Sequence, residues 1–112
     1  MSTQYIPERG DVIWVDFSPT VGHEQAGRRP GVVLSPRAYN EPSELAFVCP
    51  ITNSEKGYAF EVPIPTGLPV TGVILVDQAR PVDWRMRNVI FICRMPRQVL
   101  DAAKRTLAKL IE

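Results

Sequence analysis

The sequence predicts one mainly β domain, a small barrel or sandwich of six or seven short strands followed by a single C-terminal helix. A chain of 112 residues with 45% apolar side chains suits one domain with one hydrophobic core, spanning residues 1–112. Its apolar runs are short and separated by glycine and proline, which is typical of all-β folds. Only the last segment changes to the spacing of an amphipathic helix.

The first four strands are expected in the N-terminal half of the chain. Residues 11–17 carry apolar side chains on both faces, which indicates a largely buried strand. A β-branched run follows at 31–35 and another at 45–52, where Pro50 indicates an edge strand or a bulge. Residues 59–64 form the fourth expected strand.

The C-terminal half supplies the remaining elements. Residues 73–78 and 89–93 are apolar runs that predict two further strands, with a small seventh strand at 80–82 between them. Pro96 suits the first turn of a helix. After it, apolar residues recur at helical spacing and predict one amphipathic helix: Val99, Leu100, Ala103, Leu107, Leu110 and Ile111.

Composition argues against several classes of protein. No apolar run approaches the roughly 20 residues of a membrane span, and the N-terminus does not resemble a secretory signal. We therefore expect a cytoplasmic protein with no membrane partner. Cys49 and Cys93 lie in separate apolar runs, which suits small buried side chains better than a disulfide or metal framework. With one histidine, no metal site is expected, and nothing in the sequence indicates a cofactor.

The charge pattern favours an anionic ligand. The formal net charge is only +1, which is too small for indiscriminate binding to nucleic acid. Ten of the thirteen basic residues are arginines, whose planar guanidinium binds phosphate or carboxylate through two hydrogen bonds. A genomic preference for arginine over lysine would give the same bias.

The segment 22–30 is the first candidate site. It places the only histidine, an acid, an amide and two arginines between two expected strands. Metal-free cleavage of RNA needs a base for the 2′-hydroxyl, a cation at the phosphate and an acid for the leaving oxygen. Glu24 or His23 can serve as the base, and Arg29 can clamp the phosphate. A solvated connection between strands is the alternative.

Polar residues at the ends of two expected strands form a second group of candidates. Thr52 and Asn53 follow one apolar run, where short polar side chains can bind phosphate or a sugar hydroxyl. Asp77 and Gln78 end another run. A hydrogen-bonded turn is the alternative at both places.

Residues 84–87 interleave aromatic and basic side chains in a pattern that can stack a base and hold an RNA backbone. Arg85 and Arg87 are therefore candidate RNA-binding residues, together with Gln25 and Arg28 of the first segment. For Trp84, a place in the core or at a subunit interface is the alternative, because tryptophan supplies much apolar area in either setting.

The order and spacing of these motifs over about a hundred residues resemble the MazF/PemK (Kid) family of toxin endoribonucleases. The resemblance implies an SH3-like barrel of the type shared with the gyrase poison CcdB, a homodimer, and metal-independent cleavage of single-stranded messenger RNA. Its products would carry 2′,3′-cyclic phosphate and 5′-hydroxyl ends, so the expected function is that of a type II toxin that inhibits translation and growth. The matching segments are Gly10–Phe17, Pro19–Thr20, Gly22–Pro30, Val33–Pro36, Pro50–Thr52, Lys56–Tyr58, Phe60–Val62, Gly72–Val73, Asp77–Gln78 and Asp83–Arg87.

The resemblance also assigns roles to individual residues. Arg29 and Thr52 match the catalytic pair of the family, and Glu24 matches a loop acid that is needed for activity. His23 and Asp77 match positions assigned to proton transfer or transition-state support in the Kid branch.

One position departs from the Kid pattern. The Kid-type arginine two residues before the matching aspartate is Leu75 in this chain. We therefore expect Arg29 to take the acid and stabilising roles, Thr52 to bind the phosphate, and Asp77 to contact RNA.

The resemblance implies one protein partner, an acidic and partly disordered antitoxin segment that covers the RNA path between two copies of the chain. Two other functions are weighed against it: a non-enzymatic toxin of the same fold that poisons a protein such as DNA gyrase, and a catalytically silent binding barrel. Residues 18–30, 53–58 and 65–71 are the loops expected to set the RNA sequence preference.

Overall fold

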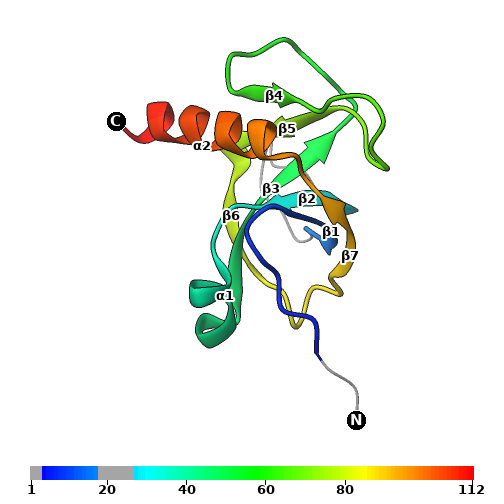
Figure 1. Ribbon diagram of the computed structural model, residues 1–112, viewed down its shortest axis with the longest axis vertical. Helices are drawn as coiled ribbons and strands as arrows, with labels where there is room; N and C mark the ends of the chain where they lie inside the picture. Colours follow the sequence, from blue (N-terminus) through cyan, green and yellow to red (C-terminus); the bar gives the residue numbers. More distant parts are fainter. Residues whose placement is uncertain (1–3, 18–26) are drawn as a thin grey trace.

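The computed structural model describes residues 4–17 and 27–112, and this part of the chain is built around a seven-stranded antiparallel sheet (Figure 1). Six strands follow the order β4-β5-β3-β2-β1-β7, and β6 pairs separately with β3. The predicted mainly β architecture with a C-terminal helix is confirmed. The elements are β1 (Asp11–Asp16), β2 (Arg28–Val33), α1 (Arg37–Ser43), β3 (Leu45–Thr52), β4 (Glu61–Pro63), β5 (Val73–Leu75), the 3₁₀ turn η1 (Val76–Gln78), β6 (Arg80–Asp83), β7 (Ile90–Arg94) and α2 (Arg97–Ile111).

β3 is the central strand of this sheet. It pairs with β2 through residues 48–50, with β6 through 45–48 and with β5 through 51–52. The prediction that Pro50 marks an edge strand or a bulge is therefore wrong. Pro50 lies opposite Gly31 and, on its other side, falls between the segments that pair with β6 and β5. Its missing N–H therefore removes no ladder bond to either of those strands.

β2 begins three residues earlier than the sequence predicts. The ladder with β1 continues through Val15–Arg29 and Asp16–Arg28, because β1 runs on to Asp16 and offers its backbone groups to both arginines. Arg28 and Arg29, which the sequence places in a loop, are therefore strand residues with fixed directions. Phe17 closes the ladder by donating its N–H to the carbonyl of Gly27 at 3.0 Å.

The strand expected over residues 73–78 ends at Leu75. Its last three residues form η1, where the N–H of Ala79 bonds to the carbonyl of Val76 at 3.2 Å. Asp77 and Gln78 therefore lie on a turn after the strand, so the alternative of a hydrogen-bonded turn is correct for them. The strand expected over 59–64 is likewise confined to Glu61–Pro63.

Helix α1 is an element that the sequence does not predict. It has seven residues, contains Pro42 and buries only Asn40, so it leaves no apolar periodicity in the sequence. It ends at Glu44, which adopts a left-handed φ of 61° and donates its N–H to the carbonyl of Asn40 at 3.0 Å.

Two apolar clusters cover the two faces of the sheet. Val12 lies in the first cluster and its neighbour Ile13 in the second, because adjacent side chains of a strand point to opposite faces of the sheet. The second cluster contains Trp84, which is 4% exposed and donates its indole N–H to the carbonyl of Asn40 at 3.0 Å. Trp84 is therefore a core residue, one of the alternatives that the sequence left open.

Helix α2 begins directly after Pro96, as predicted, and packs against β4 and η1 (Figure 1). Ala103 is fully buried in the first cluster. Leu110 and Ile111, which the sequence assigns to the same apolar face, are 47% and 78% exposed because the helix extends beyond the core. Within the described residues, no helix has the length and apolar character needed to cross a membrane.

Candidate active site

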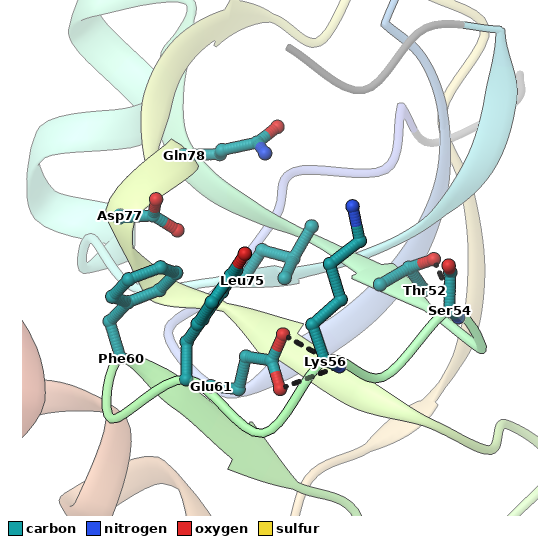
Figure 2. A pocket seen from close by; sticks show the side chains of 9 residues that line it. Thr52, Ser54, Lys56, Phe60, Glu61, Leu75, Asp77 and Gln78 are labelled. Carbon is teal, nitrogen blue, oxygen red and sulfur yellow. Dashed lines mark hydrogen bonds between the residues drawn. The ribbon is translucent and has the colours of Figure 1, made fainter. Parts of the chain in front are cut away.

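A cavity of about 470 Å³ opens at the end of β3 (Figure 2). Figure 2 shows residues of β3 and the following turn on one side and residues of β5 and η1 on the other. Because β3 pairs with β5 through Thr52 and Val73, the floor of the cavity is fixed by the sheet. The lining residues are Thr52, Ser54, Lys56, Tyr58, Phe60, Glu61, Leu75, Asp77 and Gln78.

Thr52 is the last residue of β3 and is 7% exposed. Its hydroxyl oxygen accepts the N–H of Ser54 at 3.1 Å, so the turn alternative also holds here. Accepting this bond leaves the hydroxyl proton available to donate to an anion in the cavity. The side chain of Asn53 turns elsewhere and accepts the hydroxyl of Thr71 at 2.8 Å.

Arg29 lies on the neighbouring strand at a matching position. The β2–β3 ladder ends at the pair Gly31–Pro50, and Arg29 and Thr52 each lie two residues beyond that pair, although Arg29 is not among the residues that line the cavity. Both positions fall on the face of Gly31 and Pro50, because side chains alternate along a strand. Two residues separated by 23 positions in the sequence thus both lie just beyond the last pair of the β2–β3 ladder.

Lys56 is a cavity residue that the sequence places in the specificity loop 53–58 but does not single out as a site residue. Its side chain extends between Leu75 and Thr52 (Figure 2). The carboxylate of Glu61 accepts the backbone N–H of Lys56 at 3.2 Å and that of Gly57 at 2.9 Å, which holds the turn in place. A lone lysine in a polar turn carries no periodic signal, so only its spacing after the strand end could have indicated it.

Asp77 and Gln78 lie across the cavity from Thr52 (Figure 2). Burial raises the pKa of Asp77, a backbone hydrogen bond partly offsets this, and the Glu61 carboxylate raises the pKa further. Leu75 is 5% exposed and presents an apolar wall where the Kid branch has an arginine. The cavity therefore joins an acid with a raised pKa to an ammonium group and a hydroxyl donor.

Three basic residues, Arg28, Arg80 and Arg87, lie near the last residue of β1 and the first residue of β2. Arg28 donates from Nη1 to the carbonyl of Asn88 at 2.8 Å. Arg87 lines a smaller pocket together with Asp16 and Arg80. Arg80, which the sequence likewise does not single out as a site residue, stacks at 5.0 Å on the ring of Phe17 and donates to its carbonyl oxygen.

The remaining predicted residues are not brought to the cavity. Arg85 pairs with Glu44 beside α1, on a different part of the surface. His23, Glu24 and Gln25 lie outside the described residues. Among the residues that the structure describes, no three histidine, cysteine, aspartate or glutamate side chains converge as metal ligands.

Comparison with known proteins identifies clear relatives. The family described as PemK-like, MazF-like toxin of type II toxin-antitoxin system matches residues 8–111. The endoribonuclease toxin MazF of Escherichia coli (strain K12) is 49% identical over 88 residues, covering 79% of this chain and 78% of the relative. MazF of Deinococcus radiodurans superposes with a TM-score of 0.93 at 44% identity, covering 96% and 98% of the two chains. The MazE-MazF complex of the same organism gives 0.87 at 44% identity over 96% and 97%.

Proposed function

We propose that this chain, which belongs to the PemK-like, MazF-like family of type II toxins and is an endoribonuclease, cleaves single-stranded RNA with Arg29 and Thr52 as its catalytic pair. The observation that supports the proposal is the β2–β3 register: Gly31 and Pro50 form its last pair, Arg29 and Thr52 each lie two residues beyond that pair, and Thr52 lines the cavity. The relatives support RNA cleavage, and they give no support to a toxin that poisons DNA gyrase.

The proposed reaction needs no metal. Glu24 or His23 takes the proton of the 2′-hydroxyl, whose oxygen then bonds to phosphorus. The bond from phosphorus to the 5′-oxygen breaks, and the departing oxygen takes a proton from Arg29, which regains one from solvent while the base releases its proton to solvent; the products are a 2′,3′-cyclic phosphate and a 5′-hydroxyl. Arg29 binds the charged phosphate and donates a hydrogen bond to the departing oxygen, while the Thr52 hydroxyl donates to a second phosphate oxygen.

Several further residues are proposed to hold the RNA. Lys56 offers an ammonium group inside the cavity, and Gln78 and Asp77 face it from η1. On the strand end beyond Arg29, Arg28 and Arg87 are placed to contact flanking phosphates. The proposed contacts that lie elsewhere, or outside the described residues, are Gln25, Asn53 and Arg85.

We further propose a homodimer that an acidic, partly disordered antitoxin segment inhibits by covering the RNA path. The solved MazE-MazF complex supports the antitoxin partner. An exposed apolar pair supports the dimer: Trp14 of β1 is 39% exposed and lies opposite Ile90 of β7, which is 57% exposed. Because the proposed substrate is messenger RNA, the proposed compartment is the cytoplasm.

The test is cleavage of a long single-stranded RNA in EDTA, followed by mapping of the ends. We expect Arg29→Ala and Thr52→Val to reduce the cleavage rate by about 100-fold or more, because each removes a donor to the charged phosphate. Thr52→Ser keeps the hydroxyl and should retain most of the activity. Arg105→Ala and Thr106→Val on α2 are the matched controls. Intact RNA with the wild-type protein, or unchanged cleavage by both site variants, would overturn the proposal.

A further inference from the structure

A second cleft, which we name the α2 cleft, lies apart from the cavity at the end of β3 and shares none of its lining residues. It has a volume of about 380 Å³ and lies between the turn before β1, the end of β7 and the first half of α2. Four of its lining residues are basic: Arg9, Arg94, Arg97 and Lys104. Asp101 is the one acid in the lining.

Two of these arginines are held in place by the fold. Arg94 donates from Nη1 to Asp11 at 2.7 Å, and the Asp11 side chain is only 5% exposed. Its Nη2 donates to the carbonyl of Arg9 at 3.1 Å. The Nε of Arg9 donates in turn to the carbonyl of Leu34 at 2.9 Å. The guanidinium groups are therefore positioned before any ligand arrives, which lowers the entropic cost of binding.

The other two basic residues lie on α2 without acidic partners. In the part of the chain that the structure describes, no ion pair joins Arg97 or Lys104 to a carboxylate. Asp11 offsets the charge of Arg94, and Asp101 can offset one more. The α2 cleft therefore keeps an excess of positive charge.

The start of α2 adds to this charge. The helix begins at Arg97 with no side-chain cap and no acidic residue in its first turn. A cation at this end opposes the helix dipole. An anion bound here would relieve the unfavourable arrangement. The sequence thus keeps a costly charge at a position where an acid would stabilise the helix.

We infer that the α2 cleft binds a phosphate group of the RNA chain outside the segment that is cleaved, an inference that rests on the proposed function. Asp11, which anchors Arg94, lies four residues along β1 from Val15, the residue opposite Arg29. At about 3.3 Å per residue, Asp11 and Val15 are about 13 Å apart along the strand. Small folds that bind single strands cover about 4 to 16 nucleotides, so one RNA strand can reach both places.

An acidic protein segment fits the α2 cleft less well. Peptides that dock in grooves use apolar anchors in addition to charge. The large apolar side chains that the described residues expose all lie outside this cleft. The cleft offers charge and hydrogen-bond donors, which is what a phosphate requires.

The test compares two double variants that change charge equally. Arg97→Glu with Lys104→Glu alters the α2 cleft, and Arg105→Glu with Lys109→Glu alters the same helix outside it. Two 2′-O-methyl oligonucleotides, about 5 and about 16 nucleotides long and centred on the mapped cleavage sequence, serve as uncleavable probes. Affinity is measured over a salt series, and thermal unfolding is measured for each variant.

We expect the cleft variant to bind the long probe about tenfold more weakly, with a salt slope reduced by about 0.7 for each lost phosphate contact. It should bind the short probe and cleave short RNA like the wild type. Its melting temperature should not fall, because a glutamate at position 97 suits the start of the helix. The control variant should bind both probes within about twofold of the wild type.

Three results would overturn the inference: no loss on the long probe, an equal loss on the short probe, or an equal loss in the control variant. Weakened binding of a peptide rich in glutamate and aspartate, with RNA binding intact, would assign the α2 cleft to a protein partner instead. If the wild type does not cleave RNA, the proposed function fails. The probe affinities are measured without cleavage, so they test the α2 cleft separately.

Discussion

Replacing Gly72 by alanine tests how the fold positions Thr52. Gly72 precedes β5 and has a φ of 108°, which side chains rarely adopt. A Cβ atom at this position would lie 2.1 Å from the carbonyl oxygen of Thr52 and 2.9 Å from Oδ1 of Asn53. The nearest atom belongs to the backbone of β3, so the clash cannot be relieved by rotating a side chain.

The expected loss of stability follows from two contributions. A non-glycine residue in the left-handed region costs about 1–2 kcal/mol. Overpacking against fixed atoms typically costs about 1–3 kcal/mol more. Together they lower the free energy of unfolding by roughly 2–5 kcal/mol, and at about 4 °C per kcal/mol the melting temperature should fall by roughly 8–20 °C.

Gly67→Ala is the matched control for this variant. Gly67 has a similar φ of 97°, but a Cβ atom there would meet nothing within 4 Å. The control should therefore show the backbone cost alone, so the difference between the variants measures the close approach of Gly72 to Thr52. The assays are thermal unfolding and RNA cleavage well below both melting temperatures, where Gly72→Ala should also cleave more slowly. Equal melting temperatures for the two variants would refute this explanation.

Three further predictions concern polar and titratable side chains. Asn40→Ala should lower the free energy of unfolding, measured in urea, by about 3 kcal/mol. The Asn40 side chain accepts a hydrogen bond from the Ser35 hydroxyl at 2.5 Å and donates one to the carbonyl of Pro7 at 2.8 Å, and the variant loses both. A loss below about 1 kcal/mol would contradict this. Asp77→Asn should stabilise the protein at pH 7 but not below about pH 4. The raised pKa of Asp77 means that the folded state binds more protons, so stability falls as pH rises through that pKa, and urea unfolding at both pH values checks the sign. Burial raises the pKa of Cys49 to about 12, so a thiol reagent at pH 8 should label the half-buried Cys93 first, and the reverse order would count against this.

The strands were predictable because their signal is periodic and their surroundings are apolar. The predicted ends of β3 match the observed ones, since six of its eight residues are buried and turn residues follow it. Boundaries failed where pairing or turn geometry decides the structure. β2 extends to Arg28 because β1 provides partners there, and η1 interrupts the run after Leu75. α1 could not be predicted, because only Asn40 faces the interior.

The candidate site was predictable only in part. Thr52 is recognisable as a polar residue at a strand end, whereas its alignment with Arg29 depends on a register that periodicity does not specify. Lys56 is predicted only as part of the loop 53–58 and Arg80 only as part of a short strand, because each is a single polar residue in a short segment. Trp84 was ambiguous from sequence, and its bond to the carbonyl of Asn40 shows why it belongs to the core.

Leu75, which stands where the Kid pattern has an arginine, lines the same cavity as Lys56. A strand arginine at position 75 would bring its guanidinium into the cavity, but Leu75 is buried and apolar. Among the described residues that line the cavity, Lys56 carries the positive charge, and Glu61 holds its backbone from β4. The two N–H groups bound to one carboxylate fix the backbone from which the Lys56 side chain extends. We therefore propose that Lys56, from the turn after β3, supplies the cation that an arginine at position 75 would supply from β5, beside the Thr52 hydroxyl.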